Sequence, residues 1–263
     1  MRRIIATLSF IITAATLSAQ QPPAPAWNIL VGAGAIAIPS YPGSDEHRIF
    51  PFPLAKVSYR DRAYFGPSSG GNGMALGAYA LRSPRLSVAG EVGFLPDRPA
   101  DRADALAGME DRSFVATASA SVSYTFGPLQ GSVSASQGLN DGAGLLAAGQ
   151  LSFTVPFSRK TIVITGIGAT LADARQMRWD FGVSGAEAAR RQAMLDGGDD
   201  RLPSNAGVAY SPDAGLRQVS ASLTVIRLVS THWAVIGIGG LDRLSEAAAE
   251  SSLVRQRMQL TGG

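Results

Sequence analysis

Residues 113–126, SFVATASASVSYTF, alternate apolar and polar side chains with a period of two. The even positions carry Phe, Ala, Val and Tyr, and the odd positions, Val115 aside, carry serine or threonine hydroxyls. Successive side chains of a β-strand point to opposite faces, so this pattern predicts one long strand with an apolar face and a hydroxyl-bearing face. The turn GPLQ and a second alternating run, 129–136, complete a predicted hairpin.

The same pattern recurs along the chain and predicts an all-β fold of about 12 strands, within a range of about 10–14. A transmembrane β-barrel needs strands of about nine to eleven residues, whereas a soluble sandwich uses about five or six. The other strand candidates, most of them of the longer kind, are 27–38, 51–60, 63–66, 73–81, 85–94, 144–157, 162–171, 218–225, 231–242 and 254–261.

The two faces of the predicted strands differ in a way that favours a membrane. The hydroxyl face is too polar for a dry core, and the aromatics Phe114, Tyr124, Phe126, Phe153 and Phe157 lie near strand ends, as in the interface girdles of membrane barrels. We therefore predict an antiparallel transmembrane β-barrel. A secreted soluble β protein remains the alternative.

The N-terminus has the three parts of a secretory signal: basic Met1-Arg2-Arg3, the apolar stretch 4–17, and Ala19 before a cleavage site. We predict a signal peptide at 1–19, a short tail at 20–26 and the barrel at 27–263, exported by the Sec pathway to the outer membrane of a Gram-negative cell. An uncleaved signal anchor is the alternative. The absence of cysteine excludes disulfides and thiol catalysis.

The charge of the chain limits the kinds of molecule that it can bind, and its charged segments mark the loops. Only 16% of residues are charged, against about 25% in a soluble domain. The arginines are scattered, which predicts no nucleic acid as a partner. The predicted barrel makes outer-membrane lipids its expected surroundings. The charged segments 96–112 and 185–212 are predicted loops, the second with a short helix at AEAARRQAML. Around residues 38–66, GSDEHR predicts a polar loop. Proline is tolerated at a strand start or edge and not in mid-sheet, so Pro51 and Pro53 predict the entry to a strand.

Three blocks of the sequence resemble the MipA/OmpV family of outer-membrane proteins. They are GAGAIAIPSYPGSDEHRIFPFPLAKVSYRDRAYFG, MRWDFGVSGAEAARR and HWAVIGIGGLDRLSEAAAESSLVRQRMQ. The matching residues are Pro39, Tyr41, Gly43, Ser44, Asp45, Pro51, Pro53, Tyr59, Arg60, Asp61, Arg62, Phe181, Gly182, Val183, Ser184, Trp233, Leu241, Leu244, Ala248 and Ser251.

The resemblance implies a non-catalytic scaffold that holds a lytic transglycosylase and a bifunctional penicillin-binding protein near the outer membrane. Two features depart from the family pattern: Ser252 replaces a usual proline, and the chain ends MQLTGG without a terminal aromatic strand. Because a barrel must pair its last strand to leave no edge in lipid, we expect that the C-terminal strand is truncated at Gly263.

Residues with catalytic potential are few. His47 follows Ser44, Asp45 and Glu46, which suggests a hydrolase triad, but neighbours in one loop seldom converge, and turn capping explains Ser44 and Asp45. His232 precedes Trp233, which we expect in an interface belt.

Two further groups carry no assigned chemistry. The aspartates Asp196, Asp199 and Asp200 lack calcium-loop spacing, and Arg227 either faces the lumen or reaches for lipid headgroups. We assign no catalytic, cofactor-binding or metal-binding residue, no cofactor and no enzymatic activity. The leading hypothesis is the scaffold, a narrow pore for small solutes is the alternative, and a lipid hydrolase using His47 and Ser44 ranks third.

Overall fold

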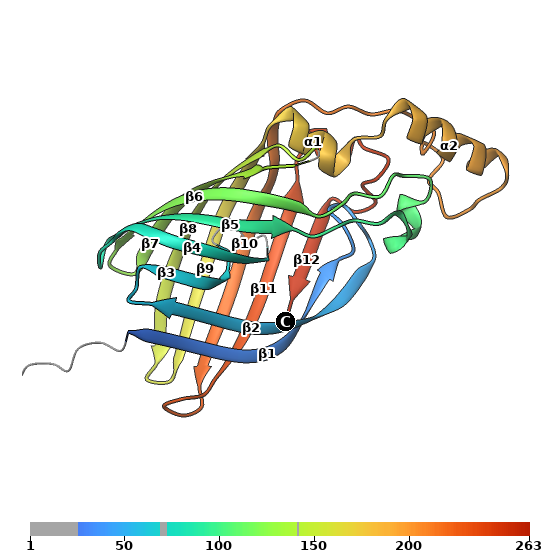
Figure 1. Ribbon diagram of the computed structural model, residues 1–263. Coiled ribbons are helices and arrows are strands. Elements are labelled where there is room, and N and C mark those ends of the chain that lie inside the picture. The colour runs from blue at the N-terminus through green and yellow to red at the C-terminus, as the bar shows by residue number, and fades with distance from the viewer. Residues whose placement is uncertain (1–25, 69–72, 141) are drawn as a thin grey trace, which may run out of the picture.

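The chain forms a closed β-barrel in which each neighbouring pair of strands is antiparallel (Figure 1). This computed structural model describes residues 26–68, 73–140 and 142–263. The predicted signal peptide and the tail residues before 26 lie outside the described residues. The strands are β1 (Trp27–Pro39), β2 (His47–Tyr59), β3 (Ala63–Pro67), β4 (Met74–Arg82), β5 (Leu86–Leu95), β6 (Val115–Phe126), β7 (Leu129–Gly138), β8 (Leu145–Ser158), β9 (Thr161–Ala172), β10 (Gly215–Leu228), β11 (Ala234–Leu244) and β12 (Met258–Gly262).

These strands confirm the predicted fold class, and each corresponds to one strand candidate of the sequence. The register also confirms the predicted faces. In the hairpin of β6 and β7, Val122 lies opposite Val133, and Ser123 lies opposite Ser132. Val133 is 61% exposed on the outer face. Inside, the hydroxyls of Ser87 and Ser123 are 2.7 Å apart, so the small polar residues satisfy one another across the strands.

Aromatic side chains mark one end of the outer apolar face. Trp27, Tyr59, Phe126, Phe157 and Trp233 all lie beside the turns at this end and are exposed. The rings of Trp27 and Tyr59 contact each other, with centroids 4.7 Å apart. An apolar band that ends in an aromatic girdle is typical of barrels that cross a membrane, because aromatic rings favour the headgroup level.

The two ends of the barrel are built differently. At one end, turns of two to five residues join the strands. At the other end, the segments 40–46, 96–114, 173–214 and 245–257 form a cap (Figure 1). The cap contains the short 3-10 helices η1 (Ala100–Arg102) and η2 (Asp104–Leu106) and the helices α1 (Ala174–Phe181), α2 (Gly185–Asp196) and α3 (Glu246–Ala249).

The helix α2 is the one that the sequence predicted, whereas α1 and α3 were missed. Each begins behind a side chain that caps its first turn: Asp173 accepts a hydrogen bond from the N–H of Gln176, and Ser245 accepts one from the N–H of Ala248. In the described part of the chain, the helices are too short or too polar to cross a membrane.

The strand β2 starts earlier than predicted. It begins at His47, so Pro51 and Pro53 lie inside the strand, opposite Ala35 and Ala33 of β1. The expectation that Pro51 would start the strand was wrong. The described residues pair β2 with β3 only from Val57 to Tyr59, so the prolines fall where β2 has one open side. Proline has no backbone N–H, so on the open side of a strand it removes no hydrogen bond between strands.

The last strand begins later than predicted. The strand β12 pairs with Gly239–Arg243 of β11 and meets β1 where Gly262 lies opposite Ala37. The residues before it do not continue the ladder because the N–H groups of Arg255 and Gln256 both donate to the carbonyl of Gly43. Residues 254–257 therefore belong to the cap.

The dry core of the protein lies at the cap end. One apolar cluster joins Ala172, Met177, Phe181, Leu244 and Ala248 between α1, α3 and the ends of β9 and β11. A second cluster lies farther out in the cap and contains Tyr41, Ala103, Ala105, Leu106, Met109, Val183, Ala188 and Leu253.

We expect that Val133→Arg lowers the free energy of unfolding by about 2–4 kcal/mol, because it places a charge on the middle of the apolar band. The matched variant Ser132→Arg faces the lumen and should change stability much less. The measurement is urea unfolding in phospholipid vesicles, followed by tryptophan fluorescence. Equal losses in the two variants would contradict the assignment of faces.

We also expect that Gly144→Ala loosens the cap and leaves the barrel intact. A Cβ at this position would lie 1.9 Å from Oδ1 of Asp173, the atom that caps α1. Loss of that cap costs about 1 kcal/mol, so limited proteolysis should cut the segment 173–214 faster. The control Gly185→Ala meets no atom within 4 Å and should cleave at the wild-type rate or more slowly. Unchanged cleavage of Gly144→Ala would contradict this anchoring.

Candidate functional site

The structure does not join His47 and Ser44 into a catalytic pair. The Ser44 side chain is 0% exposed, and its hydroxyl accepts a hydrogen bond from the N–H of Glu46 at 3.0 Å. The Nε2 atom of His47 instead lies 3.1 Å from the carbonyl oxygen of Leu260 on β12. Ser44 therefore stabilises its own turn, as the capping alternative predicts.

The other polar residues singled out in the sequence are equally separate. Asp199 pairs with Arg201 at 2.6 Å, and Asp196 accepts a hydrogen bond from Gln192. No group of three or more metal-ligating side chains exists among residues 26–68, 73–140 and 142–263. His232 contacts the hydroxyl of Thr231 in a turn.

The strand register settles the side of Arg227. This residue lies opposite Val235 on the outer face and donates to the hydroxyl of Thr161 at 2.7 Å. The lumen interpretation of Arg227 was therefore wrong, and its position at a strand end suits a headgroup contact.

The cap crosses the mouth of the barrel. The β5–β6 and β11–β12 segments leave the barrel six strands apart in a ring of twelve, yet Leu106 and Leu253 share one buried cluster. At least one of the two segments must therefore pass over the opening. The β9–β10 segment joins them, because Glu187 of α2 accepts hydrogen bonds from the N–H groups of Ser184 and Glu110. Burial alone would raise the pKa of Glu187, but these hydrogen bonds lower it below its ordinary value.

The three blocks that resemble the MipA/OmpV family meet in this cap. The Tyr41 hydroxyl donates to the carbonyl of Leu253 at 2.8 Å, and the Ser251 hydroxyl donates to the carbonyl of Phe181 at 2.6 Å. Gly43 has a φ of 99°, and a Cβ there would lie 2.7 Å from a methyl group of Val254. Only glycine fits both the left-handed backbone and this contact.

Buried arginines tie the cap together through backbone carbonyls. The Arg191 side chain is 0% exposed and donates to the carbonyls of Ala105 and Ala206 at 2.9 and 3.2 Å. Burial lowers the pKa of Arg191 below its ordinary value. Carbonyl dipoles that surround a guanidinium replace part of its lost hydration.

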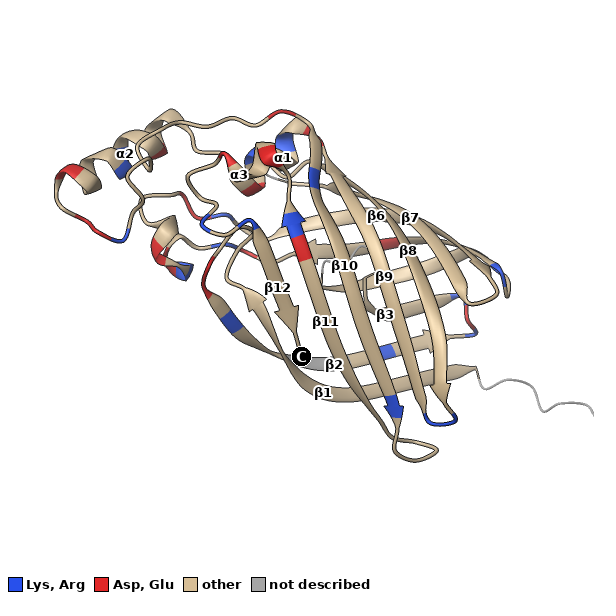
Figure 2. Cartoon of the chain, turned by 180° about the vertical axis from the view of Figure 1, so that it is seen from behind, with Lys and Arg blue, Asp and Glu red and all other residues tan. Residues whose placement is uncertain are grey.

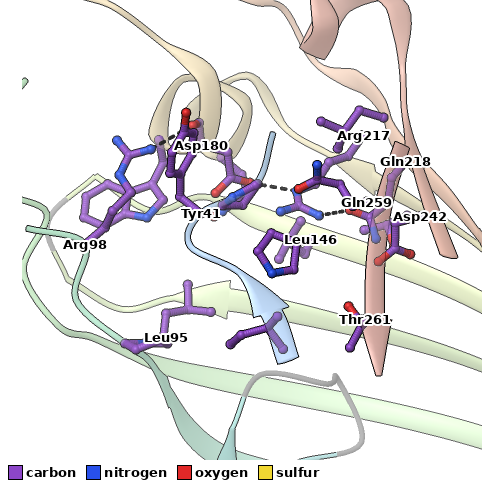
Figure 3. A pocket seen from close by; sticks show the side chains of 18 of the residues that line it. Tyr41, Leu95, Arg98, Leu146, Asp180, Arg217, Gln218, Asp242, Gln259 and Thr261 are labelled. Atoms are coloured by element: carbon purple, nitrogen blue, oxygen red, sulfur yellow. Dashed lines mark hydrogen bonds and ion pairs between the residues drawn. The ribbon is translucent and has the colours of Figure 1, made fainter. Parts of the chain in front are cut away.

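A cavity of about 520 Å³ lies between the cap and the lumen (Figure 3). Its walls combine four arginines, three aspartates, glutamines and hydroxyls with a few apolar side chains. Its polar and aromatic lining comprises Ser40, Tyr41, Arg48, Asp97, Arg98, Arg102, Ser134, Ser136, Thr170, Gln176, Trp179, Asp180, Arg217, Gln218, Asp242, Gln259 and Thr261. The size falls within the range of small-molecule sites, about 300–1,000 Å³.

Two of the cavity arginines are neutralised by neighbouring carboxylates. Nε of Arg217 lies 2.8 Å from Oδ2 of Asp180, and Nη2 of Arg102 lies 3.2 Å from Oδ1 of Asp97. Arg98 is held differently, because its Nη1 donates to the backbone carbonyl of Asp180 at 3.0 Å. Burial and the nearby charge of Arg112 lower the pKa of Arg98 to about 10, so the guanidinium remains charged at neutral pH.

The turn end carries a second distinctive feature, a concentration of basic residues (Figure 2). The set considered is the five turns, residues 60–62, 83–85, 127–128, 159–160 and 229–233, together with Arg82 and Arg227 at the adjoining strand ends. The structure describes all of these residues, and Asp61 is the only acidic one among them. We call the basic residues of this set the basic turn end. It consists of Arg60, Arg62, Arg82, Arg85, Arg159, Lys160 and Arg227.

The sequence predicted the loops and turns that form the cavity and the basic turn end, but not which of these segments meet in space. Arg98 and Arg102 fall inside the predicted loop 96–112, and no spacing within that loop indicates that they meet Asp180 or Arg217. The basic turn end was detectable, because each predicted turn could have been scored for charge.

Comparison with known proteins adds the family. The family model described as MltA-interacting protein MipA matches residues 31–263. A search of curated proteins finds no match to the chain. Because the family match covers most of the barrel and all of the cap segments described above, the chain belongs to the MipA family.

Proposed function

We propose that this protein is a non-enzymatic outer-membrane barrel that holds a lytic transglycosylase, and with it a bifunctional penicillin-binding protein, close to the outer membrane. In this proposal, residues 1–19 direct Sec export in a Gram-negative cell and are removed. The family description, MltA-interacting protein, supports a lytic transglycosylase as the partner.

The basic turn end is the observation that carries the proposal on this chain. Short turns of outer-membrane barrels face the periplasm, and long segments face outward. With that orientation, the seven basic residues of this end face the compartment that contains murein and its enzymes. Small turns offer little apolar area, so attraction between opposite charges would bring the partner in and orient it.

The lipid-hydrolase hypothesis receives less support from the geometry. Ser44 is buried and its hydroxyl already caps a turn, while His47 is directed to a backbone carbonyl. A serine nucleophile needs an exposed hydroxyl within reach of its base.

A narrow pore is the second candidate, and the lumen favours it. The inner face of β6 to β8 carries serine, threonine and glutamine, which water can solvate. The cap opposes it, because at least one segment passes over the mouth.

We expect that neutralising part of the basic turn end weakens partner capture. The variant Arg62→Gln, Arg85→Gln, Arg159→Gln, Lys160→Gln should lower recovery of lytic transglycosylase about tenfold in a crosslinking pull-down from native membranes, because four rim charges together supply about 1–2 kcal/mol. Raising ionic strength should reduce wild-type recovery as well.

The control for this experiment neutralises Arg190 and Arg201 in the cap, and its recovery should match that of the wild type. Equal recovery by the turn variant would reject the basic turn end as the docking surface. A wild-type bait that captures no murein enzyme would reject the scaffold itself.

We further expect that the purified protein gives no stepwise conductance in planar bilayers, since the cap crosses the mouth. The measurement is single-channel recording at about 1 M salt, with the Gly144→Ala variant recorded in parallel. Reproducible ohmic steps from the wild-type protein would favour the pore over the scaffold.

A further inference from the structure

The cavity beneath the cap contains buried arginine donors that the protein itself leaves unpaired. The Arg98 side chain is only 9% exposed, and its Nη2 has no hydrogen-bond partner among the described residues. Nε of Arg48, near the start of β2, is also buried and has no hydrogen-bond partner among the described residues. Both residues line the cavity.

An unpaired buried guanidinium donor is costly, so these two need an explanation. Leaving a buried donor unsatisfied costs about 1–3 kcal/mol, and more where the group is charged. The carboxylates nearby are already engaged, because Asp180 accepts from Arg217 and Gln176, and Asp97 accepts from Arg102. Arg112 adds another positive charge beside Arg98, with which it exchanges two backbone hydrogen bonds.

We propose that this cavity is a binding site for a small polar organic anion, whose carboxylate or phosphate oxygens accept hydrogen bonds from Arg98 and Arg48. Guanidinium groups suit both kinds of oxyanion because they offer planar, paired donors. This role is separate from the scaffold proposal, since it uses the cap end and not the turn end.

The rest of the lining limits the ligand further. Hydroxyls of Ser134, Thr170 and Thr261 face the same cavity, which suits a molecule that carries hydroxyl groups of its own. Asp242 lies with Gln218 on the side away from Arg98 in Figure 3, and it forms no ion pair within the described residues. A carboxylate at this position disfavours a second negative charge, so a ligand with one anionic group fits better than a polyanion.

The test is isothermal titration of the full chain in detergent micelles at pH 7 and low salt. The probes are gluconate, glucose 6-phosphate and glucose. Each has six carbon atoms, but gluconate carries a carboxylate, glucose 6-phosphate carries a phosphate, and glucose is uncharged. At least one of the two anions should bind, and glucose should bind at least about tenfold more weakly. Binding of gluconate alone identifies a carboxylate ligand, and binding of glucose 6-phosphate alone identifies a phosphate ligand.

Variants connect the binding to the two arginines. Arg98→Gln and, separately, Arg48→Gln should each weaken anion binding about tenfold or more, because each removes a charged donor. Arg190→Gln is the control: its guanidinium lies in the cap but contacts Gly108 and Glu110 outside the cavity, so binding should be unchanged. Heat-modifiable gel migration establishes that every variant contains a folded barrel.

Three results would overturn the site: no binding of either anion to the wild type, equal binding of glucose, or wild-type affinity in both folded arginine variants. Failure here leaves the scaffold proposal untouched, because the pull-down depends on the basic turn end.

Discussion

The structure depends on backbone hydrogen bonding around a closed ring of strands. A barrel wall in lipid has no water to satisfy its N–H and C=O groups, so the strands β5 to β10 pair with a neighbour on both sides. Among the described residues, β1 and β2 are paired along their length with each other and only briefly with β12 and β3. This requirement for paired backbone groups explains why alternation of small residues suffices for the wall: Ala, Val and Gly face outward, while serine and threonine pair with one another inside. Both buried apolar clusters lie in the cap. Tyr64 of β3 is a large buried side chain of the wall, and its hydroxyl donates to the carboxylate of Glu91 on β5.

This division shows how far the sequence could be interpreted. Period-two alternation predicted the number of strands and the outward face of residues such as Val122, because a strand's faces are a local property. The predicted start of β2 was wrong because prolines are tolerated inside that strand on its open side. The open side exists because β3 is short, and a local sequence pattern does not reveal the length of a neighbouring strand. The helices α1 and α3 were missed although Asp173 and Ser245 are good caps, because each helix is short and its buried face contacts residues distant in the chain.

The candidate sites follow the same distinction. Charge in short turns is visible in a sequence once the turns are predicted, since a turn's residues stay together. The cavity is different, because Arg48, Arg98 and Arg217 lie in three segments that only the closed ring brings around one space. The residues that resemble the family, such as Tyr41 and Ser251, gain a physical meaning in the structure: they hold the cap segments against one another.

The cap also has a consequence for the order of assembly. The hydrogen bond from Tyr41 to Leu253 spans 212 residues, and that from Gly43 to Gln259 spans 216. A contact between residues so far apart in the chain costs much conformational entropy when it forms alone, because it closes a long loop. The cost is small after the hairpins between the two residues have paired. We therefore expect the first and last hairpins to dock in the cap after the chain between them has formed the wall. An assembled cap, in which the segments after β1 and β11 contact each other, is thus a structural marker that the ring of strands has closed.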